Sequence, residues 1–264
     1  MADRQSMFEQ LPNSLVKKSK IHIINFPWDT ASKLTENKEG VEFFDSLKIS
    51  EQVKKINSIK NNFDICIVIS WSGARVAYLA GLNYIIYFVG SALRVPPFIK
   101  NPRLDYLQQP LPSLNYFERK FYKKILDNAL SCIANADDLF NLLKKYRKEK
   151  IFEIGIPVDT TIFNENVKPI EREKTKFTFL SPQRIGLAKG IDIIWSALKL
   201  CKSDFEVLQV EWFLGQRTDE EREINNLLVR ERPSQVKLIP VIKRENLASN
   251  FLFVDAIIGQ MKNG

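Results

Sequence analysis

Short apolar runs alternate with amphipathic stretches along most of the chain, and this alternation constrains the fold more than any other feature of the sequence. The apolar runs are 21–26, 64–70, 84–89, 131–134, 151–154, 177–181, 207–214, 236–239 and 255–259. The amphipathic stretches are 51–60, 74–80, 116–129, 138–146, 190–201, 219–231 and 246–251. Strands that alternate with helices form βαβ units with right-handed crossovers and parallel sheets. The sequence therefore predicts an α/β fold.

A polar, charged segment divides the chain. Residues 164–173 contain Pro169 and are followed at once by the apolar run that starts at residue 177. Such a segment is typical of a domain boundary. It predicts a first domain over residues 1–165 and a second over 170–264. A proline-rich segment, 95–112, is incompatible with a continuous helix or a central strand, so we expect a long loop after the strand 84–89.

Composition and charge exclude several classes of protein. Of the 264 residues, 45% are hydrophobic and 11% aromatic, which excludes a disordered chain. No window is apolar enough for a membrane-spanning helix, and residues 1–5 show no secretory signal, so we expect a cytoplasmic protein. The net charge is +8, of which residues 1–168 carry +6. This surplus fits an anionic partner (phosphate, nucleic acid or an acidic membrane surface) or solubility alone.

The few cysteines and the single histidine limit which kinds of metal site and catalytic site the chain can form. Cys66, Cys132 and Cys201 are far apart in sequence, which disfavours a disulfide framework or a local metal site. His22 is the one histidine, and it lies within a predicted strand. The single histidine therefore argues against catalysis by a Ser-His-Asp or Cys-His arrangement and against metal binding through histidines.

The segment 179–192 predicts an anion site. A strand ends at residue 181, and a helix opens near Lys189 and Gly190, so Arg184 and Lys189 lie at or near a helix N-terminus. That end of a helix carries unpaired N–H groups and a partial positive charge. Gly186 and Gly190 would let a phosphate approach the backbone. There is neither a G-x-G-x-x-G nor a P-loop motif, so dinucleotide-binding and P-loop interpretations lose their main support.

In its motifs the chain resembles retaining glycosyltransferases of the GT-B fold, particularly family 4. The pattern Arg184-x4-Lys189-Gly190-Ile191-Asp192 is similar to the donor-binding motif of that family. Other segments resemble family motifs in the same order: 88–94, 131–139, 152–163, 211–215 and 236–240. The resemblance covers roughly residues 20–264 and implies two Rossmann-like, doubly wound domains.

The resemblance also implies a site. Arg184 and Lys189 would neutralise the donor diphosphate, so that side chains replace Mg²⁺ and no metal or other cofactor is needed. Gly90, Ser91 and Arg94, from the segment 88–94, would lie near the sugar or the acceptor. Loops at Gly215 and Pro240 would lie on the nucleotide side. The implied partners are a nucleotide-sugar donor and a glycan or lipid-linked acceptor, and no nucleic acid is expected.

The chain departs from the family pattern at several points. Val89 stands where the family often has histidine, and Ala92 where it has aspartate. Residues 10–18 resemble the end of the helix that follows the family's first strand. Residues 255–264 match the strand just before its Glu-x7-Glu motif. These matches lead us to expect a chain truncated at both ends, with an incomplete second domain.

Two basic clusters carry a separate hypothesis. Residues 119–124 and 144–148 interleave lysine or arginine with aromatic residues, a pattern that fits peripheral contact with a membrane at its inner face, or merely solvated helix faces.

The leading hypothesis is a hexosyltransferase that acts on a nucleotide-sugar, with retention. The alternatives are a catalytically inactive or fragmentary nucleotide-binding module of the same fold and, on charge alone, a nucleic-acid-binding protein.

Overall fold

The computed structural model describes residues 22–26, 41–104, 110–156, 158–213 and 219–262. The chain divides into two compact units. The N-terminal unit contains the described residues of 4–103 and 112–157. The C-terminal unit contains those of 158–264, together with residues 104, 110 and 111.

The N-terminal unit is built on a parallel sheet of order β3-β4-β5-β6, whose strands are Cys66–Ile69, Tyr84–Phe88, Ser131–Ala134 and Ile151–Glu153. A separate parallel pair joins β1 (Ile23–Asn25) to β2 (Val41–Phe43). The helices are α2 (Ile49–Ile59), α3 (Ser70–Leu79), α4 (Ser91–Arg94), α5 (Tyr116–Asn128) and α6 (Asp137–Tyr146), with a 3-10 turn at Lys60–Asn62. The sequence pattern missed β2 because Glu42 interrupts its apolar residues.

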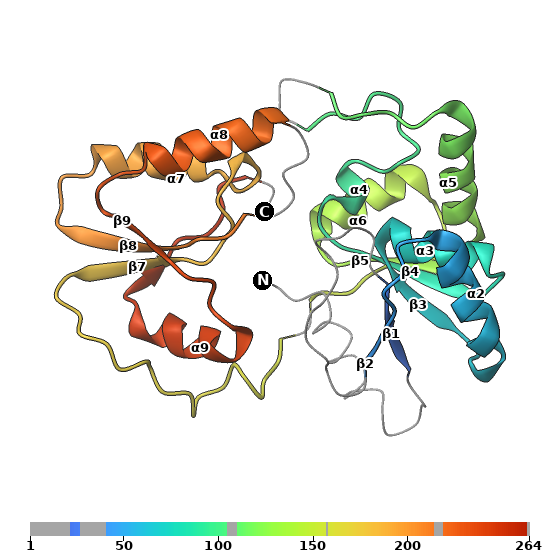
Figure 1. Cartoon of the computed structure of the whole chain (residues 1–264), viewed down its shortest axis with the longest axis horizontal. Helices are drawn as coiled ribbons and strands as arrows, with labels where there is room; N and C mark the ends of the chain where they lie inside the picture. The colour runs from blue at the N-terminus through green and yellow to red at the C-terminus, as the bar shows by residue number, and fades with distance from the viewer. Residues whose placement is uncertain (1–21, 27–40, 105–109, 157, 214–218, 263–264) are drawn as a thin grey trace. The chain divides into compact units, whose positions relative to one another are not determined.

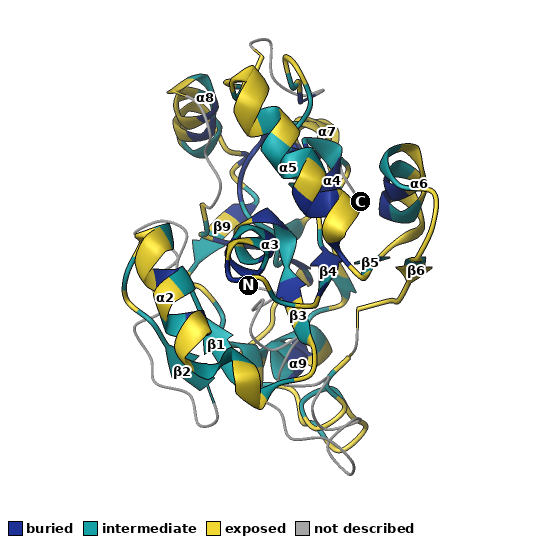
Figure 2. Cartoon of the chain, turned by 90° about the vertical axis from the view of Figure 1, so that its right-hand side faces the viewer, coloured by how far each residue is buried: buried dark blue, intermediate teal, exposed yellow. Residues whose placement is uncertain are grey.

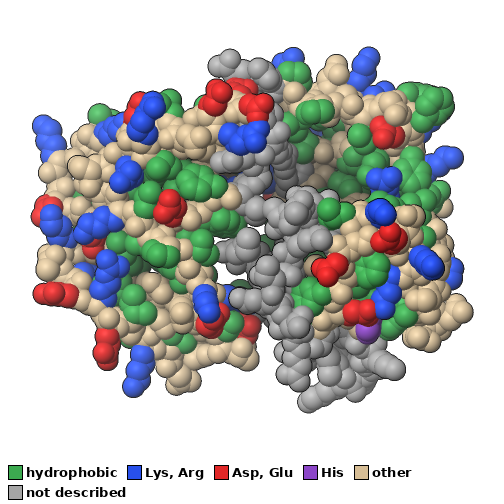
Figure 3. All heavy atoms as spheres, viewed as in Figure 1, with side chains coloured by type: hydrophobic (Ala, Val, Ile, Leu, Met, Phe, Trp, Pro, Cys, Tyr) green, Lys and Arg blue, Asp and Glu red, His purple; other side chains and the backbone are tan. Residues whose placement is uncertain are grey.

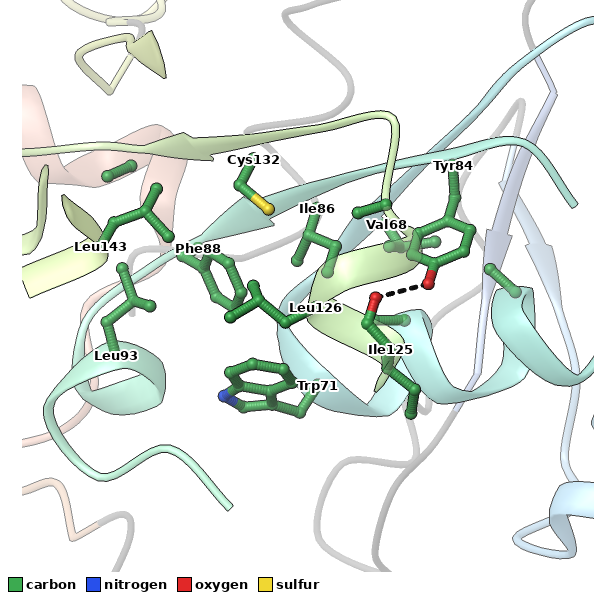
Figure 4. Close-up of a cluster of buried hydrophobic side chains, with 14 of the residues drawn as sticks. Val68, Trp71, Tyr84, Ile86, Phe88, Leu93, Ile125, Leu126, Cys132 and Leu143 are labelled. Atoms are coloured by element: carbon green, nitrogen blue, oxygen red, sulfur yellow. Dashed lines mark hydrogen bonds between the residues drawn. The ribbon is translucent and has the colours of Figure 1, made fainter. Parts of the chain in front are cut away.

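A large apolar cluster packs against the sheet of this unit, and a smaller one, of Ile56, Val76 and Ala80, lies between α2 and α3. The large cluster joins β4 to α3 and α5 and is centred on Trp71, Phe88 and Leu126 (Figure 4). The ring centroids of Trp71 and Phe88 are 4.9 Å apart. The buried hydroxyl of Tyr84 donates to the backbone carbonyl of Ile125 at 2.6 Å, which ties the sheet to α5. Figure 2 marks most of β4 and part of α3 as buried, as expected for a central strand and the helix that covers it.

Helix α5 begins where its capping residues predict. The side chain of Asn115 accepts from the backbone N–H of Glu118 at 2.9 Å, and the Glu118 carboxylate accepts from the N–H of Asn115 at 3.1 Å. This reciprocal capping box satisfies two backbone donors that the first turn would leave without partners. It fixes the start of the helix directly after the proline-rich segment.

The C-terminal unit is a second parallel sheet, of order β10-β7-β8-β9. Its strands are Ala256–Ile257, Phe177–Ser181, Phe205–Val210 and Val236–Ile239 in that order. Its helices are α7 (Ile191–Leu200), α8 (Asp219–Arg230) and α9 (Arg244–Phe253), and a 3-10 turn, Leu187–Lys189, precedes α7. Helices α7 and α8 lie on one face of the sheet and α9 on the other (Figure 1).

Alternate residues of its central strands serve the two faces. Phe179 and Val207 pack in the cluster of α7 and α8, whereas Leu180 and Leu208 pack in the cluster that includes Phe253 of α9. This period of two is the pattern of a strand covered on both sides. The predicted strand 207–214 ends earlier, at Val210, where the β8 ladder with β9 closes.

The surface mixes charges of both signs. In the view of Figure 3, basic and acidic side chains are interspersed over the described residues of both units rather than gathered by sign. Among the described residues, we find no helix that combines the length and the apolar character needed to cross a bilayer.

Candidate functional site

The predicted anion site lies at the carboxyl edge of the C-terminal sheet. Because β7, β8, β9 and β10 are all parallel, the segments that follow them leave the sheet at the same edge. Ligands of open α/β sheets bind outside the carboxyl ends of the strands. The segment 182–190, which carries Arg184 and Lys189, follows β7 at this edge.

This segment, which we call the anion loop (residues 182–190), has a defined backbone. Ile185 is buried, and its N–H donates to the carbonyl of Trp212, beyond β8, at 2.8 Å. The 3-10 turn Leu187–Lys189 follows, and Gly190 adopts φ +72° before α7 begins at Ile191. A left-handed φ favours glycine, which explains the residue type at this junction.

The segment after β10 packs against the anion loop. The ammonium of Lys189 donates to the side-chain oxygen of Gln260. The N–H of Met261 donates to the carbonyl of Lys189 at 3.0 Å, and the Gln183 amide donates to the carbonyl of Gly259 at 3.2 Å. Residues 259–261 therefore form one wall of the loop. Sequence reasoning missed Gln260, because no local pattern indicates a contact between residues 71 positions apart.

The two glycines of the anion loop are in close contact with protein atoms. A Cβ on Gly190 would lie 2.9 Å from the Cβ of Met261. A Cβ on Gly186 would lie 3.2 Å from the side-chain oxygen of Asn225 on α8. Close packing within the protein therefore accounts for both glycines. Their contact with a phosphate stays a prediction.

The remaining residues predicted for the nucleotide side are placed unequally. Pro240 is exposed and directly follows β9, so it lies at the same edge of the sheet as the anion loop. Gly215 lies outside the described residues.

The residues predicted for the sugar or acceptor belong to the N-terminal unit. Gly90 has φ +54° and makes the turn after β4, and Ser91 begins the short helix α4. The guanidinium of Arg94 pairs with the Asp138 carboxylate of α6 at 2.5 Å. These residues lie at the carboxyl edge of their own sheet.

Two carboxylates meet near the carboxyl edge of the sheet in the N-terminal unit. A hydrogen bond between Glu153, at the end of β6, and Asp137, at the start of α6, raises the pKa of Glu153, and their like charges act in the same direction.

Elsewhere, burial raises the pKa of the Cys66 and Cys132 thiols to about 11. Within the described ranges, no group of three or more His, Cys, Asp or Glu side chains is arranged to hold a metal ion.

Comparisons with known proteins support the fold. At the level of sequence, no protein-family model matches the chain, and no curated protein matches it. A glycosyltransferase from Rickettsia africae has a similar structure, with 18% identity and a TM-score of 0.64, over 97% of this chain and 68% of that one. HepE of Anabaena in complex with UDP-glucose has 14% identity and a TM-score of 0.54, over 83% of this chain.

A third similar structure is an α-glucosyltransferase in complex with UDP, with 10% identity and a TM-score of 0.54, over 96% of this chain and 68% of that one. The chain spans about 60% of the length of HepE. The predicted fold class, an α/β protein of GT-B type with Rossmann-like parallel sheets, is confirmed.

Proposed function

We propose that the protein is a glycosyltransferase that takes a hexosyl group from a nucleoside-diphosphate sugar. The observation that carries this proposal is the anion loop, a segment at the carboxyl edge of a parallel sheet that contains both Arg184 and Lys189. The fold supports it, because the similar structures are glycosyltransferases, two of them with UDP-glucose or UDP bound. The donor domain would be 170–264 and the acceptor domain 1–165.

The proposed chemistry follows from where charge develops. When the glycosidic bond to the donor breaks, negative charge grows on the leaving diphosphate. Fixed cations aimed at that charge stabilise the transition state more than the ground state. Arg184 and Lys189 would supply these cations, and we propose that no metal is required. Transfer would proceed with retention, as the motif resemblance implies.

The acceptor would be a hydroxyl of a glycan or of a lipid-linked sugar, bound on the N-terminal side. We propose that Gly90 and Ser91 belong to the acceptor site, since they follow β4 at the carboxyl edge of its sheet. Arg94 would contribute through its guanidinium, which Asp138 orients.

Calorimetric titration with UDP tests the donor site. The single variants Arg184→Ala and Lys189→Ala should each weaken UDP binding by about tenfold to hundredfold. The reason is that hydrogen bonds to charged groups contribute about 1.5–3 kcal/mol. The matched control is Lys176→Ala, which removes a cation paired with Asp204 near the start of β7, at the opposite edge of the sheet. Unchanged UDP affinity in both site variants would contradict the assignment.

Turnover separates the enzyme from a binding module of the same fold. The chain is incubated with a panel of nucleotide-sugars and acceptors, and released nucleoside diphosphate is measured. Release that depends on the acceptor and is lost in Arg184→Ala supports the transferase. Binding of UDP with no release from any donor supports the catalytically inactive module.

We further propose that the protein contacts a membrane surface through the start of α5. Phe117 is 80% exposed there beside the exposed Tyr116, and Lys120 lies over the Tyr116 ring at 4.7 Å from its centroid. Exposed aromatic side chains next to lysines suit an anionic lipid surface. Sedimentation with phosphatidylglycerol vesicles tests this, and Phe117→Ser should reduce binding several-fold. Equal sedimentation of both proteins would contradict it.

A further inference from the structure

The backbone on both sides of Arg184 is anchored from within the C-terminal unit. On one side, the side-chain amide of Gln209 in β8 donates to the carbonyl of Gln183 at 2.8 Å. On the other, the N–H of Ile185 donates to the carbonyl of Trp212 at 2.8 Å. The peptide groups that flank Arg184 are thus both bonded to β8 or to the residues just after it.

A second buried amide closes the turn from the side of α8. Asn225 is 2% exposed, and its side-chain oxygen would lie 3.2 Å from a Cβ on Gly186. Gly186 itself adopts φ +153°, a backbone conformation that L side chains rarely adopt. Asn225 therefore packs directly against the glycine that lies two residues after Arg184.

Packing alone does not explain why these two positions are polar. Gln209 is fully buried, and its register partner on β7 is the buried Ser181. The side-chain oxygens of Gln209, Asn225 and Ser181 have no hydrogen-bond partner among the described protein groups. Burying such atoms is unfavourable, and apolar residues of similar size would pack at lower cost. Polar side chains at such buried positions indicate a role other than packing in the core.

We propose that Gln209 and Asn225 are positioning residues, which hold the turn 183–186 so that the Arg184 guanidinium meets the donor diphosphate. The inference rests on the proposed function and names residues that act on its site. Gln209 acts by its bond to the Gln183 carbonyl, and Asn225 by its packing against Gly186. Neither is a catalytic residue, because each acts through the backbone that carries Arg184.

A double-mutant cycle tests this role. Gln209→Met keeps the approximate side-chain volume but removes the amide that donates to the Gln183 carbonyl, and Asn225→Ala removes the packing against Gly186. Each should weaken UDP binding by about tenfold in the otherwise natural chain, because a misplaced cation loses its geometry. In the Arg184→Gln background the same changes should have almost no further effect, since coupled residues are not additive. Full additivity would overturn the proposal.

A buried polar residue away from the loop provides the control. Thr178, also fully buried, lies on β7 three residues before Ser181 and donates to the carbonyl of Lys176 at 2.9 Å. Thr178→Val should lower the unfolding temperature yet change UDP affinity by less than about twofold in both backgrounds. A loss of affinity in this variant equal to that of Gln209→Met would show a general structural effect and overturn the proposal.

Hydrogen exchange in the ligand-free protein tests the positioning role separately from the proposed function. Gln209→Met should speed exchange of the Ile185 amide at least tenfold, with little change at Val207 in the same sheet. If the natural chain fails to bind UDP but Gln209→Met speeds exchange at Ile185, the proposed function is wrong, and the role of Gln209 in holding the turn 183–186 stands. If UDP binds and exchange at Ile185 is unaltered, the positioning role is wrong and the proposed function stands.

Discussion

The two units share a parallel four-stranded sheet but differ in how they cover it. The N-terminal unit packs a large cluster around Trp71 and Phe88 against its sheet and a smaller one between α2 and α3, which includes Ile56. Ile67 and Phe152, which alternate with core residues of this sheet, stay exposed. The C-terminal unit packs separate clusters on its two faces. Similar topology therefore does not imply a similar core, because the helices supplied by the connections decide which faces are buried.

The carboxyl edges of the two sheets differ as well. In the N-terminal unit, Arg94 is held by the carboxylate of Asp138. In the C-terminal unit, Lys189 is bonded to the amide of Gln260, and Arg184 lies between two anchored peptide groups. Both edges contain an ion pair, Arg94–Asp138 in the N-terminal unit and Lys262–Asp192 in the C-terminal unit, and we propose that the diphosphate binds at the edge of the C-terminal unit.

The largest expected effect concerns the N-terminal core. Phe88 is fully buried, so Phe88→Ala should lower the free energy of unfolding of that unit by about 3–5 kcal/mol. Hydrogen exchange followed by peptide-level mass spectrometry should show lost protection in β4 and α3 and none in β8. The half-exposed Phe177 of the other unit is the control, and its alanine variant should change little. Equal loss of protection in both units would mean that they unfold as one.

A smaller effect compares two glycines with positive φ. Gly190→Ala combines backbone strain with a clash against Met261, and should cost about 1–3 kcal/mol more than strain alone. Gly90→Ala meets no atom within 4 Å, so only the conformational cost of about 1–2 kcal/mol remains. Urea denaturation measures both. A larger loss for Gly90→Ala would show that the two junctions have been ranked wrongly.

A single hydrogen bond comes next in size. Tyr84→Phe removes the hydroxyl that donates to the Ile125 carbonyl, and should destabilise the N-terminal unit by about 1 kcal/mol. Tyr87→Phe offers a matched comparison, because its hydroxyl donates to the Ile154 carbonyl at a longer 3.3 Å. We expect a smaller loss there by thermal unfolding, and the reverse order would contradict the assigned bonds.

Thiol chemistry distinguishes the units without loss of stability. Burial raises the pKa of Cys66 and Cys132 from near 9 to about 11, whereas Cys201 in the C-terminal unit is exposed. At pH 8, iodoacetamide should label Cys201 first, as mass spectrometry would show. Because folding raises the pKa of both thiols, the folded state binds more protons than the unfolded state between about pH 9 and pH 11, and the free energy of unfolding should fall as the pH rises through this window. Rapid labelling of Cys132 would contradict its burial.

Much of the fold could be predicted, because it depends on local pattern. The alternation of apolar runs predicts both parallel sheets, and the segment 179–192 predicts a strand, loop and helix where β7, the anion loop and α7 lie. Contacts between distant residues could not be predicted. Gln209, Asn225 and Gln260 converge on the anion loop only after the sheet has formed, and no local pattern indicates a buried amide with such a role.

We propose that the donor diphosphate binds at the carboxyl edge of the sheet in the C-terminal unit, and not at that of the N-terminal unit. Calorimetric titration of UDP into the natural chain, Arg184→Ala and Arg94→Ala compares the two edges. We expect Arg184→Ala to weaken UDP binding by about tenfold or more, since a charge-assisted bond is lost, and Arg94→Ala to change it by less than about threefold. A strong loss of UDP affinity in Arg94→Ala, with unchanged affinity in Arg184→Ala, would show that the diphosphate does not bind at the anion loop.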